Sequence, residues 1–212
     1  MEAITEEQIR LFRLRTHHLD RWYPLSDALR VAGACGFQNT PPGAWEIAFQ
    51  NRIRDCTRED MVRMLEVEKT LLQAWSIRGV PLVFPTAESD TFLSALVARE
   101  CEPWIYTQGI QLALDHLQMH LEELLPLLVQ VMPQLDGQVD KSKTLLDQTL
   151  ADWMLPVLPA EKRDLWNQPS MYGSPDKQTV GGAVVSFLLR PCAFMGLVVF
   201  GRREGISPAF TS

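Results

Sequence analysis

The sequence has no apolar run long enough to cross a membrane as a helix, for which about 18 residues are needed. The nearest candidate, residues 183–200, is interrupted by Arg190 and Pro191. A secretory signal would begin with basic residues followed by an apolar stretch, whereas the first ten residues, MEAITEEQIR, are acidic and polar. We therefore expect a cytoplasmic protein with no membrane partner.

Cysteine is scarce and scattered, with four residues in 212 and no two of them within 20 positions of each other. This spacing excludes a zinc ribbon and a Cys-x-x-Cys redox site, so we expect reduced and mostly buried thiols. His116 and His120 have the i, i+4 spacing of a helical metal site, but the segment offers no glutamate in His-Glu-x-x-His register and no evident third ligand. We expect a polar helix face there, with no metal and no cofactor.

Basic charge is also in deficit, because 20 Lys and Arg stand against 26 Asp and Glu. The resulting net charge of −6 at first argues against a nucleic-acid partner, but the acidity is confined to the middle of the chain. Residues 83–140 carry one basic and nine acidic residues, whereas residues 1–82 are balanced and residues 141–212 are net +2. Local basic faces at both ends are therefore compatible with DNA binding, although the charges alone do not demonstrate it.

The chain does contain the material of a packed core, with 46% hydrophobic residues, six tryptophans and nine phenylalanines. Apolar periodicity and N-terminal capping residues predict helices that begin near Thr5, Ser26, Thr57, Ser142 and Thr179, the last reaching Leu189. Further helices are predicted over about residues 45–53, 88–101 and 108–131. Residues 38–43 are predicted to form a loop, because paired prolines do not continue a helix.

Two β-hairpins complete the predicted pattern. Residues 70–77 and 80–84 are apolar and flank Arg78-Gly79, while residues 194–200 and 206–210 flank a Gly-Arg-Arg-Glu-Gly segment. We predict a mainly α fold with small β-hairpins (α+β), organised as tandem winged-helix-like units over residues 1–102 and 103–212. The chain stops directly after the last predicted strand, so the second unit is either complete or truncated at its C-terminal end.

Helices followed by an arginine-tipped hairpin are typical of proteins that bind double-stranded DNA. A helix fits the major groove, a flanking hairpin reaches the phosphates, and arginines anchor the backbone independently of base sequence. The candidates for such contacts are Arg52, Arg54, Arg78, Arg202 and Arg203. The alternative for each of them is an ordinary solvated surface charge. Arg78 and the Arg202-Arg203 pair stand out because they lie at the predicted hairpin turns.

Several segments together resemble a known family. The chain has Gly36-Phe37-Gln38, an arginine-containing helix over residues 44–52, a threonine-led segment over residues 57–65, and residues 70–79 ending in Trp-x-x-Arg-Gly. This order resembles the bacterial winged-helix DNA-binding proteins that include the AlkZ-type DNA glycosylases, and residues 194–210 resemble the family's second hairpin. The resemblance implies tandem winged helices and excision of alkylated or crosslinked bases by cleavage of the N-glycosidic bond.

The resemblance also implies a catalytic Gln-hydrophobic-Gln or Gln-hydrophobic-Asp segment, from which this chain departs. Its first glutamine matches Gln38, but Asn39 is not hydrophobic and Thr40 is neither glutamine nor aspartate. The Thr-hydrophobic-His segment that follows Trp-x-x-Arg-Gly in the family is replaced here by residues 80–82, Val-Pro-Leu. An amide can orient a water molecule, whereas a threonine hydroxyl supplies no negative charge for a cationic sugar. Gln38 is equally explained as a loop residue that caps a helix.

Three hypotheses therefore remain open at this point. The leading one is a winged-helix DNA-binding protein of DNA repair, in the cytoplasm and associated with the nucleoid. It would be a DNA N-glycosylase with a divergent site in which Gln38 positions water and Thr40 assists. The second is a non-catalytic DNA-binding or regulatory module, and the third is a protein-interaction scaffold. The sequence does not decide whether the protein is an enzyme, nor does it give the lesion or the oligomeric state.

Overall fold

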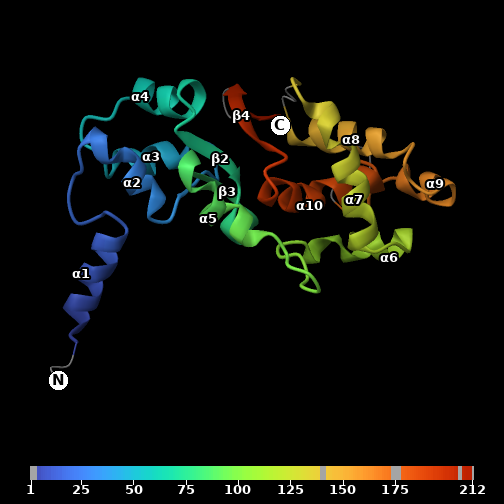
Figure 1. Ribbon diagram of the computed structural model, residues 1–212, viewed down its shortest axis with the longest axis horizontal. Helices are drawn as coiled ribbons and strands as arrows, with labels where there is room; N and C mark the ends of the chain where they lie inside the picture. The colour runs from blue at the N-terminus through green and yellow to red at the C-terminus, as the bar shows by residue number, and fades with distance from the viewer. Residues whose placement is uncertain (1–3, 139–141, 173–177, 205–206, 212) are drawn as a thin grey trace. The chain divides into compact units, whose positions relative to one another are not determined.

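The computed structural model describes residues 4–138, 142–172, 178–204 and 207–211. Within these ranges the chain forms ten α-helices, short 3-10 turns and two small β-sheets (Figure 1). The predicted α+β class, mainly helical with small hairpins, is confirmed. No helix in the described ranges is both long and apolar enough to span a membrane.

The chain divides into two compact units. Unit 1 comprises Met1–Gln73 and Val80–Phe92, and unit 2 comprises Ala74–Gly79 and Leu93–Ser212. The short Ala74–Gly79 segment therefore packs with unit 2, although its flanking residues belong to unit 1. The winged-helix arrangement and the predicted boundary after residue 102 remain predictions.

Unit 1 contains five helices, and local capping explains where the longest of them begins. In α1 (Glu6–Thr16), Thr5 accepts a hydrogen bond from the Gln8 amide at 3.2 Å and Gln8 caps the Thr5 amide in return. Thr57 and Asp60 form the same reciprocal cap on α4 (Arg58–Val62). The helices are α1, α2 (Ala28–Gly33), α3 (Ala44–Gln50), α4 (Arg58–Val62) and α5 (Ser89–Phe92).

A three-stranded sheet lies beside α2 and α3 in unit 1 (Figure 1). Its strands, β1 (Phe37–Gln38), β2 (Leu71–Trp75) and β3 (Pro81–Pro85), follow the order β1-β3-β2. The first strand differs from the sequence-based expectation of a loop that begins at Gln38. It forms because Phe37 is buried against Phe49 and pairs with Val83, which leaves Gln38 opposite Leu82.

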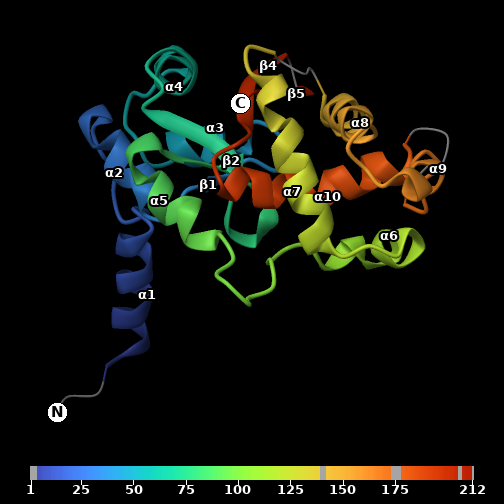
Figure 2. The ribbon, with the colours of Figure 1, turned by 45° about the vertical axis from the view of Figure 1, so that its right-hand side comes forward.

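Unit 2 is built around the long helix α10 (Val180–Phe194), which crosses behind α7 (Leu121–Val131) in Figure 2. Most of α10 is buried. It packs along α8 (Lys143–Met154) and also contacts α6 (Gln111–Leu117), α7 and α9 (Arg163–Trp166). The other elements are α6 (Gln111–Leu117), α7 (Leu121–Val131), α8 (Lys143–Met154), α9 (Arg163–Trp166), β4 (Val199–Glu204) and β5 (Ser207–Thr211). The two strands pair antiparallel as a hairpin.

Three of the helix boundaries predicted between residues 88 and 200 are wrong. The helix predicted over residues 108–131 is two helices, because Gln118 adopts a left-handed backbone and His120, capped by Glu123, begins a new helix. The helix predicted over residues 88–101 ends at Phe92. Helix α10 continues through Pro191 to Phe194, where its last turn is buried, so the following strand begins at Val199 rather than at residue 194.

Candidate functional site

The loop after β1 is fixed by one buried polar side chain. Asn39 is only 4% exposed, and its amide nitrogen donates to Gln73 Oε1 at 3.0 Å. Its side-chain oxygen accepts from the Gly43 amide at 2.6 Å, while its backbone N–H donates to the Pro81 carbonyl at 2.9 Å. These contacts tie the loop to β2, to β3 and to the start of α3.

The two predicted catalytic residues flank this anchor. Gln38 and Thr40 are both exposed, whereas Asn39 between them is buried. The amide and the hydroxyl are therefore both accessible to solvent, one at the end of β1 and the other in the loop that follows it. Together they provide hydrogen-bond donors and acceptors that can orient a water molecule, but no carboxylate.

Asn39 and Gln73 were not recognised from the sequence as a pair. The usable signal was the replacement of a hydrophobic position by asparagine, together with a glutamine inside the otherwise apolar segment Leu71–Trp75. Because a buried amide needs a hydrogen-bond partner, two polar residues at otherwise apolar positions are candidates to bind each other.

Arg52, a predicted DNA-binding residue, has partners within unit 1. Its Nε donates to the His17 carbonyl at 2.8 Å and its Nη1 to the Ala48 carbonyl at 2.7 Å. The guanidinium carbon lies 5.1 Å from the ring centroid of Phe37, and partial burial lowers the pKa of Arg52. Arg52 thus supports the strand that carries Gln38. Arg54, by contrast, is exposed.

Arg78 lies at the predicted turn between β2 and β3. It is exposed and has a left-handed backbone, with φ of 66°. The next residue, Gly79, is also left-handed and is buried, and a Cβ added to it would lie 2.9 Å from Tyr106 Cβ. Gly79 donates its N–H to the Ser76 carbonyl at 2.8 Å and its carbonyl accepts from Arg190 Nε at 3.1 Å. The Arg-Gly part of Trp-x-x-Arg-Gly is therefore an exposed cation followed by a position with no room for a side chain.

The tryptophan of the same segment anchors it to the second hairpin. The Trp75 ring stacks on Phe210 with centroids 5.3 Å apart and lies 4.7 Å from Phe200. Arg202 and Arg203 were expected at the tip of that hairpin, but they lie within strand β4, because the strand extends to Glu204. Residues 205–206 of the predicted turn lie outside the described residues.

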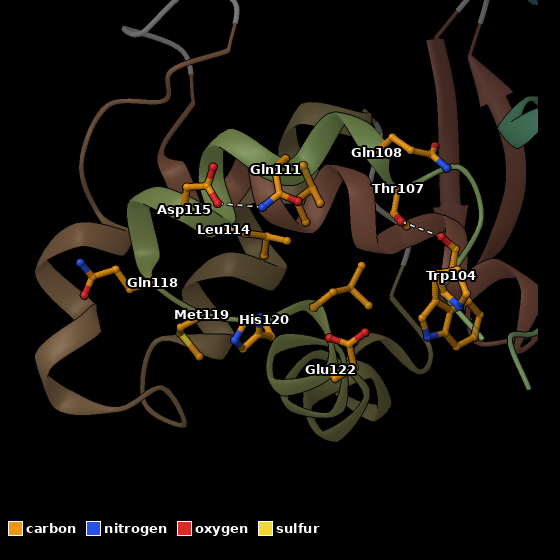
Figure 3. A pocket seen from close by; sticks show the side chains of 13 residues that line it. Trp104, Thr107, Gln108, Gln111, Leu114, Asp115, Gln118, Met119, His120 and Glu122 are labelled. Carbon is orange, nitrogen blue, oxygen red and sulfur yellow. Dashed lines mark hydrogen bonds between the residues drawn. The ribbon is translucent and has the colours of Figure 1, made fainter. Parts of the chain in front are cut away.

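Unit 2 contains a cavity of about 650 Å³ that involves none of the predicted site residues (Figure 3). It lies beside α6 and the start of α7, with Trp104, His120 and Glu122 among its lining side chains. Gln111 and Asp115, hydrogen-bonded at 2.7 Å, line it from α6. The cavity lies in unit 2, whereas Gln38 and Thr40 belong to unit 1.

Among the described residues, no three His, Cys, Asp or Glu side chains are grouped to hold a metal ion.

Comparison with solved structures identifies the fold of the chain, and comparison with family models identifies its family. The chain matches Streptomyces sahachiroi DNA glycosylase AlkZ with a TM-score of 0.64 and 23% identity, over 100% of this chain and 50% of that one. The two share a fold, and this chain spans half the length of the AlkZ chain. The family model described as DNA glycosylase AlkZ-like matches residues 31–209, so the chain belongs to the AlkZ-like DNA glycosylase family. Comparison with curated proteins gave no significant match.

Proposed function

We propose that this protein binds double-stranded DNA and hydrolyses the N-glycosidic bond of a damaged, N-alkylated base. Family membership supports the reaction class. The observation that carries the assignment to a site is the exposure of Gln38 and Thr40 on either side of the buried, hydrogen-bonded Asn39. A loop that is anchored by a buried side chain and exposes two neighbouring polar groups can position a nucleophilic water.

In this mechanism the base departs with the electrons of the C1′–N bond, and an alkylated, cationic base leaves as a neutral molecule. Water adds to C1′ of the cationic sugar and releases a proton to solvent. The Gln38 side-chain carbonyl accepts a hydrogen bond from that water, and the Thr40 hydroxyl provides a second contact. Phosphate contacts are assigned to four of the arginines predicted from the sequence, Arg54, Arg78, Arg202 and Arg203. The fifth, Arg52, donates to the His17 and Ala48 carbonyls and is assigned to supporting the strand that carries Gln38.

The threonine at position 40 favours a second candidate function, that of a DNA-binding protein without excision activity. A hydroxyl is a weak base and holds no negative charge near the sugar, whereas an aspartate at this position would. A scaffold that binds other proteins is the third candidate, and it is favoured by the excess of acidic residues over residues 83–140.

The test is release of 7-methylguanine from an alkylated duplex by the wild type and four variants. We expect Gln38→Ala to lower the rate by about 100-fold, the cost of misplacing a reacting group by about 1 Å. Gln50→Ala is the matched control, because Gln50 is an exposed glutamine at the end of α3, and it should retain the wild-type rate. Thr40→Asp and Thr40→Gln restore the third position of the family segment and should raise the rate.

The outcomes separate the candidates. Equal background release by the wild type and Gln38→Ala, with no gain from Thr40→Asp, would remove the enzyme hypothesis. Binding of the same duplex across salt concentrations then decides between the other two, since phosphate contacts make log Kd change with log salt by about 0.9 per neutralised phosphate. Absence of salt-dependent binding would leave the protein-interaction scaffold.

A further inference from the structure

The Ser76–Gly79 turn holds its exposed arginine in an unfavourable backbone conformation. Arg78 has φ of 66° and ψ of 11°, in the left-handed region that residues with a Cβ rarely adopt. Gly79, which follows with φ of 65°, adopts the same region at little steric cost. A backbone outlier of this kind persists only where its surroundings fix it, and such outliers are concentrated at functional sites.

The fixing contact comes from helix α10. Arg190, 111 residues further along the chain, donates from Nε to the Gly79 carbonyl at 3.1 Å. Its Nη1 donates to the Ser186 carbonyl at 3.4 Å, so the same guanidinium joins the turn to α10. The space around Gly79 is filled by Tyr106 and by Arg190 itself, because a Cβ placed on this glycine would lie 2.9 and 3.1 Å from their nearest atoms.

Ser186 links Arg190 to an ion pair on α8, Lys143 with Asp147, in which only the carboxylate is buried. Lys143 Nζ lies 2.9 and 3.2 Å from the two carboxylate oxygens of Asp147 and also donates to the Ser186 hydroxyl. The Asp147 side chain is 3% exposed. Burial lowers the pKa of Arg190, and the Asp147 carboxylate opposes that effect. The contacts of Ser186 with Lys143 and with Arg190 thus connect the turn to both α8 and α10.

We propose that Arg190 is a positioning residue that holds the Ser76–Gly79 turn so that Arg78 contacts a phosphodiester of bound DNA. The inference rests on the proposed function for its ligand, but the positioning step is a property of unit 2 alone. Arg190 itself is half-buried, and two of its guanidinium nitrogens bind backbone carbonyls. It acts through the turn, whereas Arg78 is exposed and faces solvent.

The test combines amide exchange with a double-mutant cycle. Arg190→Gln should raise the exchange rate of the Gly79 amide by about tenfold, the effect of losing one hydrogen bond of ordinary strength. Arg163→Gln is the matched control. Arg163 is also half-buried in unit 2 and also donates to backbone carbonyls, those of Pro156 and Leu158, but none of these lies in the turn.

DNA affinity is then measured for Arg78→Ala, Arg190→Gln and the double variant. Each single change should weaken binding and reduce the salt slope by about 0.9, the value for one lost phosphate contact, and the double variant should be no weaker than Arg78→Ala. A purely structural role of Arg190 would instead give losses that multiply. Arg190→Lys, which retains the charge but not the Nε donor, replaces Arg190→Gln if the latter does not fold.

Three results would overturn the inference, and each has a different meaning. Unchanged exchange at Gly79 would show that Arg190 does not hold the turn. Faster exchange with multiplying losses of affinity would show that it holds the turn but does not act through Arg78. Faster exchange with DNA binding that is absent, or unaffected by Arg78→Ala, would remove the phosphate contact and with it the part of the proposed function that rests on Arg78.

Discussion

Replacing Asn39 by leucine gives the middle of the Gln38–Thr40 segment the apolar residue that the family pattern has there, yet we expect it to destabilise this protein. The substitution removes the donor to Gln73 Oε1, at 3.0 Å, and the acceptor of the Gly43 amide, at 2.6 Å. Gln73 is 8% exposed, so its side chain then lacks a partner in the core. An unsatisfied buried polar group costs about 1–3 kcal/mol, while the half-buried Gly43 amide can bind water at little cost.

The expected loss is therefore about 2 kcal/mol of unfolding free energy for Asn39→Leu, and a similar loss for Gln73→Leu. Because each change leaves the other residue unpaired, the double variant Asn39→Leu/Gln73→Leu should return to within about 1 kcal/mol of the wild type. Equilibrium urea unfolding measures all four proteins, with equal m-values and one transition as the condition for comparison. Losses that simply add in the double variant would refute the argument that the two amides satisfy each other.

Three further changes test other parts of the structure. Iodoacetamide should alkylate exposed Cys35 in the folded protein but reach Cys192 only after denaturation, because Cys192 is fully buried and burial raises its pKa to about 12. Burial raises the pKa of Asp147 above its ordinary 3.8, so its protonated form stabilises the fold below that pH. This contribution is lost as the pH rises through the raised pKa of Asp147. Urea unfolding should therefore show the wild type losing stability relative to Asp147→Asn as the pH rises from 3.8 through that pKa. Gly181→Ala places a Cβ against the Trp166 indole nitrogen and should lower the unfolding free energy by about 1–3 kcal/mol.

Each of these expectations has a contrary result. Equal labelling of all four cysteines in the folded protein would contradict the burial of Cys56 and Cys192. Parallel stability curves for wild type and Asp147→Asn would show that the carboxyl titrates normally. For the glycine, Gly201→Ala is the control, since a Cβ at Gly201 meets nothing nearer than 3.7 Å. An equal loss in both alanine variants would remove the explanation by crowding against Trp166.

The starts of helices were predicted well where a capping side chain marks them. Thr5, Thr57, Ser142 and Thr179 were all assigned from sequence to helix N-termini, and in each case the side-chain oxygen accepts a hydrogen bond from an amide three residues later. Such a cap is complete within four residues, so the sequence alone contains all of its chemistry.

The features that escaped prediction depend on residues far apart in the chain. Strand β1 exists because Phe37 pairs with Val83, and the Asn39 amide is satisfied only by a residue 34 positions later. The contact of Arg190 with Gly79 spans 111 positions, and the sequence showed Arg190 only as an interruption of an apolar stretch. Tertiary packing decides such contacts, and local propensity and periodicity are silent about them.

The two departures from the family segment differ in what folding requires of them. Asn39 is buried, so its amide could replace an apolar side chain only together with a partner, and Gln73 is that partner. Thr40 is exposed, so the stability of the fold places little constraint on its identity. A substitution at Thr40 therefore changes the chemistry of the loop at a smaller cost in folding free energy than a substitution at Asn39. For this reason the release rates of the wild type and Gln38→Ala, compared with those of Thr40→Asp and Thr40→Gln, test the proposed excision more directly than any measurement of stability.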